Sequence, residues 1–132
     1  MAADPHRFAV KVYWEDTDAG GIVYHAGYLR FAERARSEML SEQGVDQWSL
    51  LEDEGLALAV REMTISFHSP ARLGESLEVV TKITETRGAS VWLDQQIHRG
   101  GTNLTGLILQ IACVNRRGRA VRLPHSVREA LG

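Results

Sequence analysis

Three acidic side chains fall within four positions of one short segment, at Glu15, Asp16 and Asp18. Paired glycines follow, and a helical period starts near His25. Backbone N–H groups in the first turn of a helix have no intrahelical acceptor and carry partial positive charge. They can polarise a carbonyl and stabilise an oxyanion, while a nearby carboxylate attacks that carbonyl or deprotonates a water. The pattern fits acyl transfer to water, although acids ahead of a helix are more often caps and solvated charge.

Other catalytic signatures are missing from the sequence. It contains no G-x-S-x-G elbow, no H-E-x-x-H, no C-x-x-C, no P-loop and no G-x-G-x-x-G. The five histidines are scattered without the spacing of metal ligands. We therefore expect neither a metal site nor a redox cofactor.

The length and composition favour one globular domain, residues 1–132, with 44% hydrophobic residues. A net charge of -2 argues against a nucleic-acid partner, since nucleic-acid-binding domains are usually basic. The single cysteine, Cys113, lies in an apolar run and reads as a buried structural thiol. Met1 to His6 lack the apolar core of a secretory signal, and no stretch approaches the ~20 apolar residues of a membrane span. We expect a cytoplasmic protein without membrane insertion.

The candidate acidic segment connects a predicted strand to a predicted long helix. Alternation of apolar residues predicts a strand over 8–14, and the polar stretch 15–21 must be a loop. Spacings of four, three and four residues predict a helix over 25–43, with Gly44 ending it. A short second helix is expected up to residue 54, with Asp46 as its N-cap.

The second half of the chain has β periodicity. Alternating or apolar runs predict strands over 56–68, 77–83, 91–97, 104–115 and 120–123, and one or two helical turns over 124–131. The run 104–115 is apolar on both faces, as in a central strand covered on each side. One long helix followed by antiparallel strands is an α+β pattern, which a curved sheet wrapped around that helix satisfies. Such a sheet leaves an outer face and edges that need cover, so we expect an oligomer.

Two segments resemble a known family. Residues 13–36, YWEDTDAGGIVYHAGYLRFAERAR, resemble the signature of the hot-dog-fold thioesterases of the 4-hydroxybenzoyl-CoA thioesterase superfamily. Residues 66–79, SFHSPARLGESLEV, are similar to a second recurring stretch of these proteins. The first segment most resembles the acyl-CoA thioesterases associated with the Tol-Pal system of Gram-negative bacteria. The resemblance implies a hot-dog fold and hydrolysis of an acyl-CoA substrate.

The resemblance also implies roles for individual residues. Asp18 matches the catalytic aspartate, acting as nucleophile or general base, and Tyr24 and His25 match the Tyr-His pair at the start of the helix. A backbone N–H near His25 would polarise the thioester carbonyl. Glu33 and Arg36 also match, and we interpret both as structural. Candidates for contact with the substrate are Trp14, Gly21, Ser69, Arg87 and Ser90.

One candidate departs from the family pattern, and two groups of residues could contact the nucleotide. Trp14 stands where the family pattern leads us to expect tyrosine, so a phenolic hydroxyl is replaced by an N–H donor and more bulk. Arg87 and Ser90 resemble positions where hot-dog enzymes meet the nucleotide. The cluster Arg116, Arg117, Arg119 and Arg122 suits the phosphates of CoA, but charged turns are usually solvated surface.

The resemblance implies a homodimer or homotetramer with active sites at subunit interfaces. Acyl carrier protein stays open as the carrier of the thiol. Two rival functions also stay open. One is another hot-dog enzyme, a dehydratase or hydratase acting on acyl thioesters. The other is a non-catalytic acyl-binding or scaffold protein of the cell-envelope machinery.

Overall fold

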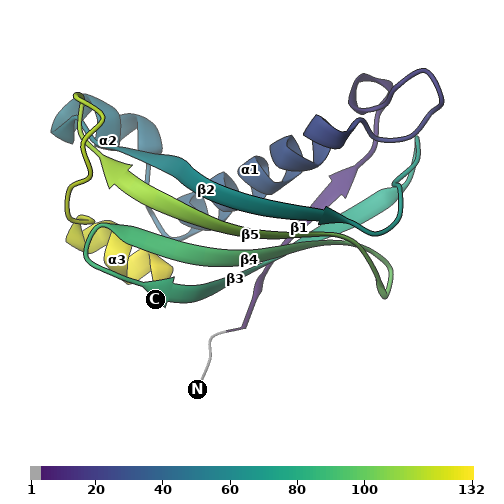
Figure 1. Ribbon diagram of the computed structural model, residues 1–132. Helices are drawn as coiled ribbons and strands as arrows, with labels where there is room; N and C mark the ends of the chain where they lie inside the picture. The colour runs from purple at the N-terminus through teal and green to yellow at the C-terminus, as the bar shows by residue number, and fades with distance from the viewer. Residues whose placement is uncertain (1–3) are drawn as a thin grey trace.

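The computed structural model describes residues 4–132 and contains one curved antiparallel sheet against which a long helix packs (Figure 1). The strand order is β1-β3-β4-β5-β2. The strands are β1 (His6–Lys11), β2 (Ala57–Phe67), β3 (Ser76–Thr86), β4 (Ser90–Arg99) and β5 (Thr102–Val114). The helices are α1 (His25–Glu42), α2 (Gln47–Glu54) and α3 (His125–Leu131), with a 3-10 turn η1 (Trp14–Asp16). This is the α+β, hot-dog arrangement that the sequence predicts. Residues 1–3, which form half of the N-terminal stretch considered above, lie outside the described residues.

Helix α1 crosses the inner face of the sheet because its apolar residues recur at helical spacing. The buried side of α1 includes Tyr28, Phe31, Ala32, Ala35 and Met39. The two alanines let the helix backbone approach the strands closely, and larger side chains on either side fill the remaining space. The helix ends where predicted, with Gly44 in the left-handed region just after it. No helix among the described residues is long and apolar enough to cross a membrane.

The inner face of the sheet supplies the other half of the core. Alternate residues of the central strands point toward α1 and are fully buried, for example Leu93 and Ile97 of β4 and Leu107 and Leu109 of β5. Burial raises the pKa of the Cys113 thiol, as expected for the structural cysteine predicted above. Strand β2 lies at one edge of the sheet, paired only with β5.

A buried polar network fastens α1 to the sheet. Arg36 donates to Gln95 Oε1 at 2.8 Å and is also paired with Glu33. Gln95 Nε2 donates to the carbonyl of Ala32 at 3.1 Å and to the hydroxyl of Thr81 at 3.0 Å. Burial lowers the pKa of Arg36, and the neighbouring Glu33 opposes this shift. The network supports the structural role predicted for Glu33 and Arg36.

Three details of the predicted elements are wrong. The first strand ends at Lys11 rather than residue 14, because Tyr13 N–H donates to the Asp16 carboxylate and the chain turns into η1. Residues 120–123 form no strand; only an isolated bridge joins Ala120 to Val114. Strand β5 is not covered on both faces along its whole length: on the outer face Leu104 and Ala112 are buried, but Ile108 between them keeps 47% of its surface exposed.

Candidate active site

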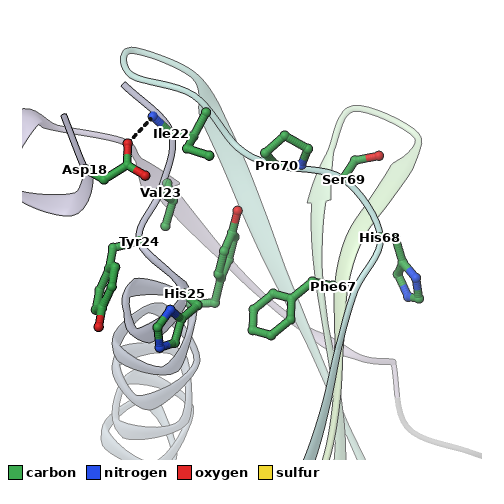
Figure 2. Close-up of a pocket in the computed structure, with 10 residues that line it drawn as sticks. Asp18, Ile22, Val23, Tyr24, His25, Phe67, His68, Ser69 and Pro70 are labelled. Atoms are coloured by element: carbon green, nitrogen blue, oxygen red, sulfur yellow. Dashed lines mark hydrogen bonds between the residues drawn. The ribbon is translucent and has the colours of Figure 1, made fainter. Parts of the chain in front are cut away.

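A pocket of about 490 Å³ opens between the N-terminus of α1 and the segment that follows β2. Ten residues line it: Asp18, Ile22, Val23, Tyr24, His25, Tyr28, Phe67, His68, Ser69 and Pro70. Figure 2 shows that they come from two walls, the acidic loop with the start of α1 on one side and the end of β2 on the other. The segments that resemble the thioesterase signatures therefore meet in space.

Backbone hydrogen bonds hold the two walls together. Val23 N–H donates to the carbonyl of Ala71, and Leu73 N–H donates to the carbonyl of Gly21, both at 2.9 Å. A further isolated bridge pairs Ile22 with Arg72. Gly21 adopts φ +77°, a conformation that favours glycine, and so allows the loop to turn back before α1. Backbone hydrogen bonds therefore hold the loop in a defined conformation.

The neighbouring acids Asp16 and Asp18 have different environments. Asp16 is buried: its carboxylate accepts from Tyr13 N–H at 2.9 Å, and its carbonyl accepts from Tyr24 N–H at 3.1 Å. Asp16 thus shapes the turn that leads to α1. Asp18 is exposed and lines the pocket. The structure separates the two acids into one that supports the loop and one that faces ligand space.

Asp18 is oriented by the backbone that follows it. Its Oδ1 accepts from Gly20 N–H at 2.8 Å and from Ile22 N–H at 3.4 Å, the latter drawn in Figure 2. These contacts fix the side chain in one direction without a charged partner. Within the described residues, Oδ2 of Asp18 accepts no hydrogen bond from another protein group. A carboxylate held by one oxygen keeps the other available to a water or a carbonyl carbon.

The first turn of α1 supplies hydrogen-bond donors beside this carboxylate. Tyr24 is the N-cap residue, and its side chain makes no capping hydrogen bond. In the described part of the chain, the N–H groups of His25 and Ala26 have no protein acceptor. The rings of Tyr24 and His25 lie 4.2 Å apart at the entrance of the helix. Unpaired N–H groups at a helix start attract a developing negative charge.

Tyr28 is a pocket residue that the sequence interpretation assigned only to the buried face of α1. Its hydroxyl accepts from Ala71 N–H at 2.9 Å, so it links α1 to the opposite wall. Its ring lies 5.6 Å from that of Phe67, which closes the floor of the pocket. The sequence contained one signal for this role: Tyr28 places a hydroxyl on an otherwise apolar helix face, and a buried tyrosine usually has a hydrogen-bond partner.

The remaining predicted residues are divided between two ends of the molecule. Ser69 lines the pocket, as do Tyr24 and His25, whereas Gly21 and Trp14 do not. Trp14 is 70% exposed on η1. Arg87 and Ser90 lie at the far end of the sheet, where Ser90 pairs with Ala112.

The pocket shows no sign of a metal site. Among residues 4–132, no three His, Cys, Asp or Glu side chains gather in a way that could hold an ion. The polar groups that line the pocket are one carboxylate, two backbone donors without a protein acceptor in the same range, and the side chains of Tyr24, His25, His68 and Ser69. This set can polarise a carbonyl and deliver an oxygen nucleophile to it.

Comparison with known proteins agrees with this geometry. Residues 12–131 match the model of the thioesterase-like superfamily. The chain is 40% identical to an acyl-CoA thioesterase YbgC of Haemophilus influenzae, over 98% of this chain and 96% of that protein. It is 46% identical to an acyl-CoA thioester hydrolase YbgC of Escherichia coli O6:H1, over 83% of this chain and 81% of that protein.

A solved structure shares the fold at similar identity. The crystal structure of a probable thioesterase from Bartonella henselae superimposes with a TM-score of 0.87 at 40% identity, covering 91% of this chain and 99% of that one. The family match over residues 12–131 includes both walls of the pocket. The chain therefore belongs to the thioesterase-like superfamily of hot-dog proteins.

Proposed function

We propose that the protein hydrolyses acyl-CoA thioesters to a free acid and CoA, with Asp18 as its catalytic carboxylate. The observation that carries the proposal is the position of Asp18 in a pocket that also contains the free N–H groups of α1. The similar proteins named as acyl-CoA thioesterases support acyl-CoA as the substrate.

The reaction begins with the carbonyl oxygen of the thioester at the start of α1. The N–H groups of His25 and Ala26 stabilise the oxyanion that forms there. As a general base, Asp18 takes a proton from water while the water oxygen adds to the carbonyl carbon. The C–S bond then breaks, the acid is released, and the CoA sulfur takes up the proton. As a nucleophile, Asp18 adds directly and displaces the CoA thiolate, and water hydrolyses the resulting anhydride.

Neighbouring side chains orient these groups. His25 stands at the helix start, where its ring can orient the attacking water or the carboxylate. Tyr24 and Ser69 border the same space from opposite walls. The apolar floor made by Tyr28 and Phe67 receives the acyl group. A panel of acyl-CoA substrates would define the length and shape of that group.

A homodimer forms in this proposal along the free edge of β2. Among the described residues this edge has no partner over 11 residues, and long open edges are rarely left uncovered. The chain exposes 7833 Å². A compact monomer of 14.7 kDa should expose only about 6,900 Å². The excess, about 900 Å², is close to the area that each partner buries in a standard interface.

The pleat of β2 favours one register for this proposed pairing. A strand that pairs with its own copy about a two-fold axis must run antiparallel to it. The bulge between Val60 and Glu62 changes the phase, so Leu58 and Val60 face inward before it and Met63 and Ile65 face inward after it. Inward residues meet inward residues when Val60 lies opposite the partner's Met63 and Leu58 opposite the partner's Ile65.

The same register joins opposite charges. Arg61 then lies beside the partner's Glu62 on both sides of the axis, and unlike charges directly opposite each other stabilise a strand pair. Phe67, which is 52% exposed in one chain, comes to lie beside the partner's Leu56 at the pocket. The active site is therefore completed at the subunit interface. Trp14 and Gly21 remain predicted substrate contacts, while Arg87 and Ser90 could reach the pocket only from a partner.

Release of thiol from a panel of acyl-CoAs, followed with a thiol-reactive dye, tests the catalytic proposal. Asp18→Asn keeps the shape of the side chain but removes its charge, and we expect at least a ~100-fold fall in kcat. Glu15→Gln is the matched control, since Glu15 is an exposed acid of the same loop outside the pocket. A folded Asp18→Asn protein with the wild-type rate would exclude Asp18 as the catalyst.

Other outcomes identify the rival functions. Dehydration of 3-hydroxyacyl thioesters without hydrolysis would indicate a dehydratase. Tight binding of acyl-CoA without turnover would indicate a scaffold. Hydrolysis of acyl groups only when they are attached to acyl carrier protein would show that this protein, rather than CoA, carries the thiol. A cytoplasmic location and a link to the Tol-Pal system remain predictions from the sequence resemblance.

Cross-linking tests the proposed dimer separately. Ala59 and Thr64 are exposed outward residues of β2 that face each other across the axis in this register. Within one chain they are roughly 16 Å apart, too far for a disulfide. Ala59→Cys/Thr64→Cys should give an oxidised dimer on a non-reducing gel. Ala59→Cys/Ser66→Cys, displaced by one outward position, should stay monomeric on the gel, and cross-linking of only this control would refute the register.

A further inference from the structure

A buried hydroxyl group beside the pocket has no hydrogen-bond partner in the described part of the protein. Thr105 of β5 is fully buried, and its Oγ1 makes no hydrogen bond with any group of residues 4–132. Two other side chains in that range have a buried polar atom of this kind, but neither belongs to a fully buried residue. A buried hydroxyl without a partner destabilises the folded protein, and valine would fill the same space without that cost. Stability alone therefore does not explain threonine at this position.

Thr105 lies beside the wall of the pocket. It pairs with Phe67 of β2, and residues directly opposite each other in antiparallel strands have Cβ atoms about 5 Å apart on the same face of the sheet. That face is the inner one, because Thr105 is in phase with the buried Leu107 and Leu109. Phe67 lines the pocket, and Figure 2 shows its ring directed toward α1. Thr105 is therefore the next inner residue of the sheet behind Phe67.

The ring of Phe67 is the part of this wall that can move. It is 52% exposed and makes a ring contact with Tyr28, at 5.6 Å between centroids. The hydroxyl of Tyr28, by contrast, is held by the N–H of Ala71. Rotation of a phenylalanine side chain between staggered conformations breaks no hydrogen bond. An acyl group that displaces the Phe67 ring would then lie against Thr105.

The unpartnered hydroxyl and its position point to the kind of acyl group that the pocket selects. We propose that Thr105 forms a hydrogen bond with an oxygen atom on the acyl chain, so that the enzyme prefers chains with a distal hydroxyl or oxo group over plain alkyl chains. A threonine hydroxyl both donates and accepts, and so can pair with either group. This inference rests on the proposed thioesterase function and names the substrate class of the same pocket.

The helix sets how far this oxygen lies from the thioester. The carbonyl would bind at the N–H groups of His25 and Ala26, and Tyr28 follows His25 by three residues, about 4.5 Å along the helix axis. An extended chain advances about 1.2 Å per bond, since one residue spans about 3.5 Å in three bonds. The rings of Tyr28 and Phe67 are therefore reached after about four bonds, near the fifth carbon of the acyl group. An oxygen on that carbon is the one expected to meet Thr105.

Kinetics with matched substrates test the assignment. We would measure kcat/KM by thiol release for hexanoyl-CoA, 3-hydroxyhexanoyl-CoA and 5-hydroxyhexanoyl-CoA. The wild-type protein should prefer 5-hydroxyhexanoyl-CoA over hexanoyl-CoA by about 10-fold, the effect of one neutral hydrogen bond. Thr105→Val keeps the shape of the side chain and removes the hydroxyl, so it should lose this preference. Its rate with hexanoyl-CoA should be at least that of wild type.

Thr81→Val is the matched control. Thr81 is also buried on the inner face, in β3, but its hydroxyl accepts from Gln95 Nε2 at 3.0 Å. Thr81→Val should lower Tm and keep the wild-type preference for 5-hydroxyhexanoyl-CoA. Thr105→Val should have a Tm no lower than wild type, because it removes a hydroxyl without a partner. A fall in Tm equal to that of Thr81→Val would show that the hydroxyl of Thr105 already has a partner, and would refute the inference.

Binding measurements separate this inference from the function on which it rests. Isothermal titration calorimetry with the Asp18→Asn protein gives Kd for hexanoyl-CoA and 5-hydroxyhexanoyl-CoA without turnover. Tighter binding of the hydroxylated chain, abolished by adding Thr105→Val, supports the inference even if the wild-type protein hydrolyses no substrate, a result that refutes only the proposed hydrolysis. Turnover with equal kcat/KM for the two chains refutes the inference and leaves the thioesterase intact. A preference for 3-hydroxyhexanoyl-CoA, or one that persists in Thr105→Val, refutes the contact between Thr105 and a distal oxygen.

Discussion

The buried network around Arg36 leads to a prediction about stability whose size can be worked out. Replacing Gln95 with leucine keeps a similar volume but removes three hydrogen bonds, to Arg36, Ala32 and Thr81. Arg36 then keeps only Glu33 as its partner, at a position where the arginine is 5% exposed. A buried charged donor left without an acceptor costs more than the hydrogen bond gained on folding.

The expected loss is about 3 kcal/mol in the free energy of unfolding, from the unsatisfied guanidinium donor and the lost amide hydrogen bonds. For a chain of this length, that corresponds to a fall in Tm of about 10 °C. Arg36→Met/Gln95→Leu should be less destabilised than Gln95→Leu alone, because it removes the buried charge together with its partner. The coupling between the two positions should reach about 2 kcal/mol.

Urea denaturation followed by circular dichroism measures these differences, at one fixed protein concentration because the stability of the proposed dimer would depend on concentration. Gln96→Leu is the control: Gln96 is the next residue of β4, faces the other side of the sheet and contacts His98 there. Its effect should be within about 0.5 kcal/mol. If Gln95→Leu matches Gln96→Leu, or if the double variant loses the sum of the two single losses, the network does not fasten α1 as reasoned.

Three further predictions concern the pocket and the core. Tyr28→Phe leaves the N–H of Ala71 without its acceptor and should lower the free energy of unfolding by about 1–2 kcal/mol in the same urea assay. Gly27→Ala places a Cβ 2.9 Å from Val23 Cγ1, so it should destabilise by about 1 kcal/mol although alanine favours helix; a more stable variant would show that the wall can yield. Cys113 is fully buried and burial raises the pKa of its thiol, so a thiol reagent at neutral pH should react only as the protein opens; rapid labelling of the native protein would contradict this.

The long helix and the acidic loop could be predicted because each has a strong local cause. The apolar residues of the helix recur on one face, at Tyr28, Ala32, Ala35 and Met39. The helical pattern ends at Gly44, which has a positive φ. Strand ends have weaker causes. The alternation of residues 8–14 continues past Lys11, but the strand ends earlier because Tyr13 N–H donates to the Asp16 carboxylate. Local periodicity contains no information about that contact.

The candidate site was predictable in part for the same reason. Asp18, Tyr24 and His25 are close in sequence and remain close in the pocket, and Ser69 joins them from the second signature. Tyr28 was assigned to the core because its spacing is that of the core, although its hydroxyl and ring line the pocket. Arg87 and Ser90 resemble nucleotide contacts in sequence but lie at the far end of the same chain. A sequence pattern suggests a role from the residue type. Whether that residue can contact the pocket depends on the end of the sheet at which the fold places it.

The bulge in β2 determines which residues of two copies of this strand can face each other in the proposed dimer. An unbulged strand alternates without interruption, so a two-fold axis passing through a residue near its middle would pair inward positions with inward positions. The extra residue at Arg61 shifts the phase. In the proposed dimer, the inward apolar faces then meet only when the axis passes between two residues, Arg61 and Glu62. In the proposed dimer, that register would bring Arg61 beside the partner's Glu62 and Phe67 beside the partner's Leu56. Deleting Arg61 should restore regular alternation and so move Ala59 and Thr64 out of register across the axis. We therefore expect the deletion to abolish the disulfide cross-link of the Ala59→Cys/Thr64→Cys variant, and an unchanged cross-link would show that the bulge does not set the register.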